Sequence, residues 1–338
     1  MFTNAYTYDD ILLVPSKSLY SRSTAKLETK LSRNIHIDIP IASANMDTIT
    51  GYELARAMSR MGAVGFLHRN MKIEENCYTV QKCLDTWKTY WPPVIPTVGV
   101  SISERERAEA LLSLGIQGIC IDIANAYSDR VADMIKFIRF KSKDVDIIAG
   151  NVASGPAALF LAKNGVDAIK VGIGPGSVCT TRRMTGFGVP QLTAIGMVKH
   201  ALMDNKFTQI PVIADGGIKS SGDIVKALWA GASTIMTGKL FAGCREANDP
   251  TSYRGMASND ARQVLLNDGD VNTVAEEGIS IEVNNAGRAQ DILKQLCNGI
   301  RSGMSYAGCE YISELNMCKH VRAVIQTQNG IIESGTRK

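Results

Sequence analysis

The chain has 338 residues, of which 45% are apolar and 21% are charged, and its formal net charge is +4. This composition is typical of a globular protein with a large core, and the mixing of basic with acidic residues argues against a nucleic-acid-binding protein. The eight irregularly spaced cysteines include no C-x-x-C pair and no His/Cys cluster at zinc spacing, and no apolar run reaches membrane-spanning length. We therefore expect a reduced, cytoplasmic protein without a signal peptide or a membrane partner.

Eight short β-rich apolar runs recur along the chain, each followed by small or polar residues. They cover residues 39–45, 63–68, 95–100, 118–124, 146–151, 167–173, 211–217 and 233–238. Such runs are typical of strands in a buried parallel sheet, and segments such as 51–62, 103–115 and 220–232 between them have helical periodicity. The repeated alternation predicts a (β/α)8 TIM barrel that spans residues 1–338 as one catalytic domain. A doubly wound sheet, which usually needs fewer strands, is the alternative.

Two glycine-bearing turns follow the seventh and eighth predicted strands, where TIM barrels often bind phosphate. Gly216 and Gly217 lie in the first turn, which leads into a helix with serine caps, and Gly238 lies in the second. Backbone N–H groups and a helix N-terminus favour bound anions. A single such loop would be better explained as a tight turn. Two loops in these places favour a phosphate site.

The strand–helix repeat ends after the eighth strand. Residues 239–288 are polar and weakly periodic, and an irregular insert at this end of a barrel is often a flap over the active site. A helical pattern at 289–303 then closes the barrel.

The sequence "GIGPGSVCTTR", residues 172–182, follows the sixth strand and therefore lies at the functional end of the barrel. It is a poor dinucleotide fingerprint, because Pro175 interrupts it and no regular helix is expected after it. Its carbonyl groups could coordinate a monovalent cation. Cys179 lies among glycines and hydroxyls beside arginines, which favour a reactive thiolate, so we interpret it as a nucleophile and the other seven cysteines as packing residues.

A proton-transfer role for Thr181 would need an acid from elsewhere in the chain. The sequence "AEEGIS" in the insert offers Glu276 and Glu277 for this purpose.

These motifs resemble the IMP dehydrogenase/GMP reductase family. The resemblance rests on "GIGPGSVCTTR", "DIANAYSD", "ADGGIKSSGD", "YRGMAS", "EEGI", "TYDDILLVPSKSLYSRS" and "ANMDTITG", which extend from about residue 6 to 308. It implies a cysteine bond to C2 of a purine nucleotide (a thioimidate-type intermediate) in an oxidoreductase of purine metabolism, potassium as a bound metal ion, and a homotetramer.

The family has two enzymatic branches, and the sequence favours the reductase. A GMP reductase uses NADPH to convert GMP to IMP and ammonia, whereas an IMP dehydrogenase oxidises IMP to XMP with NAD and uses an Arg-Tyr pair on a long flap. Here no Arg-Tyr pair lies between Met256 and Glu277, and no CBS domain interrupts the chain after residue 70. An IMP dehydrogenase without a CBS domain and a non-enzymatic nucleotide-binding regulator remain the alternatives. Arg254 or Arg262 acting as a base would favour the dehydrogenase.

The resemblance also implies a role for each matching position. Cys179 would be the nucleophile, and Thr181 with Glu277 would transfer the proton. The residues implied for GMP or IMP binding are Asp215, Gly216, Gly217, Gly238, Lys239, Gly255, Met256, Ala257 and Gly278. Those implied for the cofactor are Ser21, Arg22, Arg69, Asp122, Ile123, Ala124, Ile173 and Gly174, with Ser302, Gly303, Met304 and Ser305 reaching a neighbouring subunit's cofactor. Potassium would be bound by carbonyl groups of Gly174, Gly176, Cys179 and Arg182.

Overall fold

The computed structural model describes residues 3–86, 92–258 and 276–333. Eight parallel strands form a closed barrel in the order β10-β11-β4-β5-β6-β7-β8-β9. These strands are β4 (Ile41–Ser43), β5 (Val64–Leu67), β6 (Ile95–Val98), β7 (Gly118–Asp122), β8 (Asp146–Val152), β9 (Ala168–Val171), β10 (Val212–Asp215) and β11 (Thr234–Thr237). Seven of them lie within the predicted apolar runs, and β8 extends one residue beyond the run 146–151. The predicted TIM barrel is therefore confirmed, and the doubly wound sheet is wrong.

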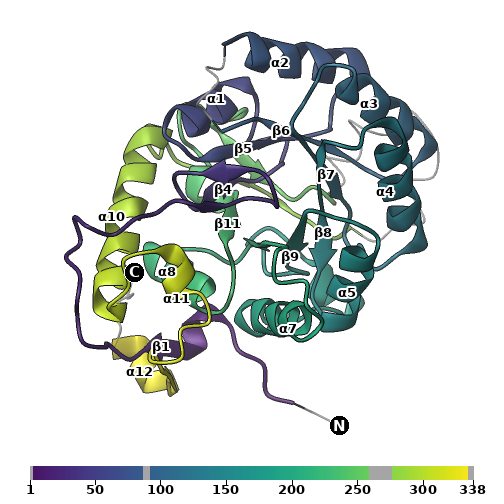
Figure 1. Cartoon of the computed structure of the whole chain (residues 1–338). Coiled ribbons are helices and arrows are strands. Elements are labelled where there is room, and N and C mark those ends of the chain that lie inside the picture. The colour runs from purple at the N-terminus through teal and green to yellow at the C-terminus, as the bar shows by residue number, and fades with distance from the viewer. Residues whose placement is uncertain (1–2, 87–91, 259–275, 334–338) are drawn as a thin grey trace.

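Helices surround the strands on the outside (Figure 1). They are α1 (Tyr52–Arg60), α2 (Ile73–Thr86), α3 (Ile102–Leu112), α4 (Asp129–Lys141), α5 (Gly155–Lys163), α7 (Gln191–Asp204), α8 (Ser221–Trp229) and α10 (Ala289–Ala307). The start of α8 follows from its sequence. Ser220 accepts a hydrogen bond from the Asp223 N–H, and the Asp223 carboxylate accepts one from the Ser220 N–H, which satisfies two N–H groups at the helix end.

Shorter elements lie around the barrel. They are the 3-10 helices Tyr8–Asp10 and Lys239–Phe241, the helices α6 (Thr181–Thr185), α11 (Ile312–Leu315) and α12 (Gln328–Glu333), and the antiparallel pairs β1 (Ile11–Leu13) with β14 (Ala323–Ile325), β2 (Thr29–Lys30) with β3 (His36–Ile37), and β12 (Ser252–Arg254) with β13 (Ser280–Glu282). The predicted insert at 239–288 is therefore less irregular than expected, because β12 and β13 form a ladder within it. Its residues 259–275 lie outside the described part of the chain.

Two apolar cores hold the barrel together. Inside the barrel, Phe66, Ile148 and Met236 pack in a cluster that continues into Leu31 and Ile37 from the β2–β3 segment. That segment therefore closes one end of the barrel. A larger core fills the space between strands and helices.

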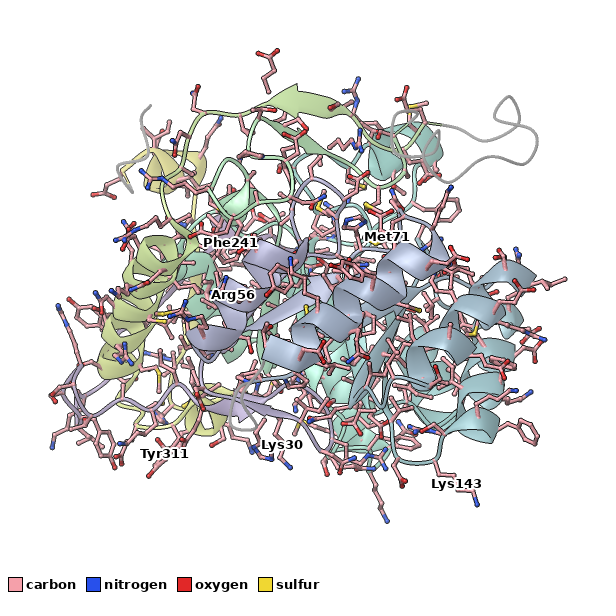
Figure 2. All side chains as sticks on the ribbon, turned by 90° about the horizontal axis from the view of Figure 1, so that it is seen from above. Lys30, Arg56, Met71, Lys143, Phe241 and Tyr311 are labelled. Carbon is pink, nitrogen blue, oxygen red and sulfur yellow. The ribbon has the colours of Figure 1, made fainter. Side chains whose placement is uncertain are left out.

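The other end of the barrel is the one that carries the loops after the strands. In Figure 2, Met71 after β5 and Phe241 after β11 lie towards that end, whereas Lys30, Lys143 and Tyr311 lie towards the opposite end. Among the described residues, no helix has the length and apolar character that a membrane span requires.

Candidate active site

The loop after β9 carries the cysteine that the sequence singled out. Gly174 adopts φ +79°, and a Cβ there would lie 2.5 Å from Cγ of Arg182, so glycine is required where this side chain crosses the loop. Nε of Arg182 donates to the Ile173 carbonyl at 3.2 Å, and a terminal nitrogen donates to the Val189 carbonyl at 2.5 Å. Arg182 thus fastens both ends of the loop around Cys179.

The insert returns to this loop and brings an acid to it. The backbone N–H of Thr180 donates to the Glu277 carbonyl at 3.0 Å, and that of Ile279 donates to the Val178 carbonyl at 3.0 Å. These bonds on either side of Cys179 fix the position of Glu277 relative to the loop.

Three side chains form a continuous hydrogen-bonded chain at this junction. The thiol of Cys179 donates to Oγ1 of Thr181 at 3.2 Å, and that hydroxyl donates to Oε2 of Glu277 at 2.7 Å. The arrangement can carry a proton between a nucleophile and a carboxylate in either direction. Of the two glutamates that the insert offered, the side chain of Glu277 makes this contact. The carbonyl of Glu276 accepts from Thr180 instead, at 3.2 Å.

A buried lysine that sequence reasoning missed organises the mouth of the barrel. Nζ of Lys170, on β9, lies 2.8 Å from Asp122 and 2.7 Å from Asp215, and its side chain is 1% exposed. Burial alone would lower the pKa of Lys170, but the two carboxylates outweigh this effect and raise it. Burial likewise opposes ionisation of Asp122, but Lys170 and the Asn45 amide hold its pKa below the usual value. The sequence held one sign of this role, because Lys170 is a single charged residue within an apolar run, where a charge needs a partner.

A cavity of about 260 Å³ lies beside the loop that carries Cys179, where the sequence predicted a phosphate site. Gly216, Gly217, Gly238 and Lys239 line it, as do residues of the N-terminal segment. Among the latter, Tyr8 was not predicted. Its hydroxyl oxygen is buried and has no hydrogen-bond partner among the residues that the structure describes. A buried hydroxyl that no described residue pairs, at a glycine-lined cavity near the N-terminus of α8, suits a phosphate oxygen as its acceptor.

The residues expected beside the base meet at the same place. Gly255 donates its N–H to the Ile279 carbonyl at 3.0 Å, and Glu277 donates to the Ala257 carbonyl at 3.2 Å. A Cβ on Gly278 would lie 3.1 Å from the Cα of Gly255. The chain segments that carry Gly255, Ala257 and Gly278 therefore pack closely over the cysteine loop, with Met256 between the first two.

The residues expected to bind a cofactor fall into two separate groups. Arg69 interacts electrostatically with Asp122 at the mouth of the barrel, and exposed Ala124 follows β7 beside partly exposed Ile123. Ile173 and Gly174 belong to the adjoining loop that carries Cys179.

The second group lies away from this mouth, on α10. Ser305 donates a hydrogen bond to the Tyr20 carbonyl at 2.9 Å, so the segment with exposed Ser21 and Arg22 runs beside α10. Ser302 and Gly303 are partly exposed there. Met304 is 0% exposed and belongs to the core, and its contact with a neighbouring subunit's cofactor stays a prediction.

Two more expectations concern the potassium site and the arginine bases. The Gly176 carbonyl accepts a hydrogen bond from the Cys179 N–H at 3.1 Å, and the Arg182 carbonyl accepts one from the Gly186 N–H. The carbonyls expected to bind potassium therefore lie in tight turns. Arg254, one of the two arginines that could act as a base, is held by Asp47 through hydrogen bonds of 2.6 and 3.0 Å. Arg262 lies outside the described residues.

Comparisons with known proteins identify the family of the chain. The family model described as the IMP dehydrogenase / GMP reductase domain matches residues 5–337. The inosine-5'-monophosphate dehydrogenases of Borreliella burgdorferi and Cryptosporidium parvum are each 36% identical to the chain, over 93% and 97% of its length and 92% and 94% of theirs. The GMP reductase of Trypanosoma brucei, solved in complex with guanosine 5'-monophosphate, has a TM-score of 0.89 at 28% identity and covers 100% of this chain with 98% of its own. The chain therefore belongs to the IMP dehydrogenase/GMP reductase family, whose members are nicotinamide-dependent oxidoreductases of purine nucleotide metabolism.

Proposed function

We propose that the protein is a GMP reductase, which converts GMP, NADPH and a proton to IMP, NADP⁺ and ammonia in the cytoplasm. The observation that carries this proposal is the hydrogen-bonded chain from Cys179 through Thr181 to Glu277. Such a chain serves a reaction in which a thiol must lose a proton and a leaving amine must gain one.

In the first half of the reaction, the sulfur of Cys179 attacks C2 of the purine. The thiol proton passes to Thr181, whose own proton passes to Glu277. The π bond between C2 and its ring nitrogen opens as the C–S bond forms, and its electron pair stays on that nitrogen until the amine leaves. C2 becomes tetrahedral, with bonds to both sulfur and the amino nitrogen. The same chain then returns a proton to the amine, the C–N bond breaks, and ammonia leaves a purine joined to the cysteine through sulfur. A positioned acid–base pair of this kind contributes about 10²- to 10⁴-fold to the rate.

The substrate would lie across the cavity and the cysteine loop. Gly216, Gly217, Gly238 and Tyr8 would bind the phosphate, and Asp215, held by Lys170, would accept hydrogen bonds from the ribose hydroxyls. Gly255, Met256, Ala257 and Gly278 would contact the base. Lys239 is exposed at the edge of the cavity, where it would add a positive charge for the phosphate.

The cofactor would lie at the mouth near Arg69, Asp122 and Ala124. NADPH bound there would supply the hydride that C2 receives. The electron pair of the broken C–S bond would return to sulfur, and a proton would restore the Cys179 thiol as IMP leaves. Asp122 is held in place for this by Lys170 and Asn45. Potassium held by carbonyls of the cysteine loop would stiffen that loop. Replacing K⁺ by Li⁺ should therefore lower turnover.

The second group of cofactor residues fits a homotetramer. Ser302 and Ser305 lie beside the segment of Ser21 and Arg22, apart from the mouth of the barrel. Together they would complete the cofactor site of a neighbouring subunit. Light scattering of the purified protein tests this arrangement, because a monomer with full activity would contradict it.

The second candidate is an IMP dehydrogenase, which the names of relatives at 36% identity favour. Arg254 was one of the two arginines that could act as a base in a dehydrogenase. Its guanidinium donates a hydrogen bond to Asp47 instead, which argues against that role.

Parallel assays of the purified protein separate the candidates. We expect NADPH absorbance to fall with GMP, and no NADH to form with IMP and NAD. NADH formation with IMP alone would establish the dehydrogenase. If neither assay shows a change in absorbance while the protein still binds nucleotide, the protein would be a non-enzymatic regulator.

A further inference from the structure

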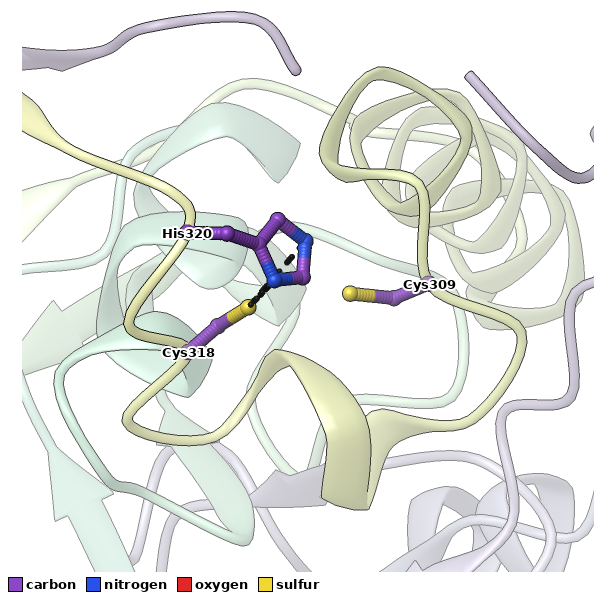
Figure 3. A group of neighbouring side chains, drawn as sticks. All are labelled: Cys309, Cys318 and His320. Carbon is purple, nitrogen blue, oxygen red and sulfur yellow. Dashed lines mark hydrogen bonds between the residues drawn. The ribbon is translucent and has the colours of Figure 1, made fainter. Parts of the chain in front are cut away.

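A second cluster of reactive side chains lies at the end of α10, outside the proposed active site. Cys309 directly follows the last turn of α10, and Cys318 and His320 follow α11. The two sulfurs and a ring nitrogen of His320 all lie within 4.8 Å of one another (Figure 3). Within the described residues, this is the group of three or more such side chains that could hold a metal ion. The sequence spacing did not reveal it, because C-x8-C-x-H matches no familiar zinc pattern.

The histidine has the orientation of a metal ligand. Its Nε2 lies 2.9 Å from the Ala307 carbonyl, to which it can donate, and its Nδ1 lies 3.1 Å from the sulfur of Cys318. A backbone carbonyl that accepts from one ring nitrogen fixes the tautomer and leaves the other nitrogen with a lone pair for a metal. Here that lone pair belongs to Nδ1, the nitrogen that faces Cys318.

We propose that Cys309, Cys318 and His320 bind one zinc ion, with a water molecule as the fourth ligand. Thiolate and imidazole are ligands that zinc favours, and zinc lies about 2.3 Å from sulfur and about 2.0 Å from nitrogen. Ligand atoms around one tetrahedral ion are therefore roughly 3.5–3.8 Å apart. The sulfur and nitrogen atoms of the cluster would have to move closer by about 1 Å, which side-chain rotation allows. Binding releases the two thiol protons, so that Zn²⁺, two thiolates and a neutral imidazole sum to zero charge. Cys309 and Cys318 are buried, whereas His320 is exposed and leaves the ion open to solvent on one side.

The ion would join the end of α10 to the segment that leads into β14. This segment is already tied to the N-terminal part of the chain, since Ser16 donates to the His320 carbonyl at 3.2 Å and β14 pairs with β1. Tyr311, near Cys309 in the chain, lies at the end of the barrel opposite the catalytic loops (Figure 2). Zinc would therefore act on stability rather than on the reaction at Cys179.

Zinc content and thermal stability test the proposal. Protein purified under reducing conditions, stripped with a chelator and titrated with ZnCl₂ should bind one zinc per chain, and Co²⁺ should give the visible absorption of a tetrahedral thiolate site. At free zinc about 100 times Kd, Tm should rise by roughly 5 °C. Cys309→Ser and His320→Ala should each weaken zinc binding about 100-fold or more and remove the rise in Tm. The exposed His320 side chain keeps the test valid if Cys309→Ser does not fold.

Two control variants locate the ion. Cys297→Ala removes another buried cysteine of α10, and Cys179→Ala removes the active-site thiol. Both should bind zinc as tightly as the unmodified chain. The proposal is overturned if Cys309→Ser and His320→Ala retain zinc, if Cys179→Ala loses it, or if the unmodified chain binds none. It is also overturned if a disulfide between Cys309 and Cys318 persists under the reducing conditions of the purification.

Discussion

Replacing Lys170 with methionine tests the ion cluster at the mouth of the barrel. The change keeps an unbranched side chain one atom shorter than lysine but leaves Asp122 and Asp215 without the cation that lies 2.8 and 2.7 Å from them. Removing one partner of a buried ion pair costs about 3–5 kcal/mol, because it leaves an uncompensated charge. Asp122 and Asp215 retain 23% and 19% exposure, so we expect the low end, about 3 kcal/mol.

The pH dependence of this loss has a definite sign. In the unmodified chain the pKa of Asp122 is lowered, so its contribution to stability is complete above the unfolded value of about 3.9 and is lost only as the pH falls through the folded pKa. In Lys170→Met, burial without a cation should raise that pKa. The variant should then lose stability as the pH rises from 5 to 7, by at most about 1.4 kcal/mol per pH unit from Asp122.

Urea unfolding at pH 5 and pH 7 measures both effects. Lys199→Met is the matched control, because Lys199 is partly buried with its pKa lowered by burial alone. It should cost less than about 1 kcal/mol, with no change between the two pH values. A loss below about 1 kcal/mol for Lys170→Met, or equal losses at pH 5 and pH 7, would refute the reasoning.

Three further predictions concern the cysteine loop and α8. Cys179→Ala should abolish NADPH oxidation while GMP still binds in a calorimetric titration, and turnover within tenfold of the unmodified enzyme would contradict covalent catalysis. Thr181→Val and Glu277→Gln should each lower kcat by about 10²- to 10⁴-fold, and the double variant should be little worse, because the two residues act as one unit. Fully additive losses in steady-state assays would contradict a shared proton path. Ser220→Ala should lower the free energy of unfolding by about 1 kcal/mol in urea, because it removes the cap of α8. An unchanged midpoint would contradict that role.

The barrel itself was predictable from local sequence. Each of its strands is an apolar run long enough to be buried on both faces, and each helix between them repeats apolar residues at helical spacing. In α8, for example, Ile224 and Leu228 are both fully buried as expected. Because these patterns are local and recur eight times, the alternation favoured a closed barrel over a doubly wound sheet.

The cysteine loop was also predictable, because its unusual residues are adjacent in the sequence. Cys179 lies among glycines and hydroxyls, and the resemblance of motifs then indicated Thr181 and Glu277. Their contact across 96 residues was an expectation from family, and the structure brings the two side chains to 2.7 Å.

Only the tertiary structure decided which distant residues share a charge or a ligand. In the sequence, Lys170 is a single lysine in an apolar run. The barrel places it between the carboxylates of Asp122 and Asp215, which lie 48 and 45 residues away in the chain. From the sequence, Cys309 and Cys318 were interpreted as packing residues, and nothing linked them to His320. The three side chains meet because the chain after α10 folds back on itself. Periodicity records which face of an element is buried. It carries no information about the partner that meets that face, because this depends on how the elements pack against one another.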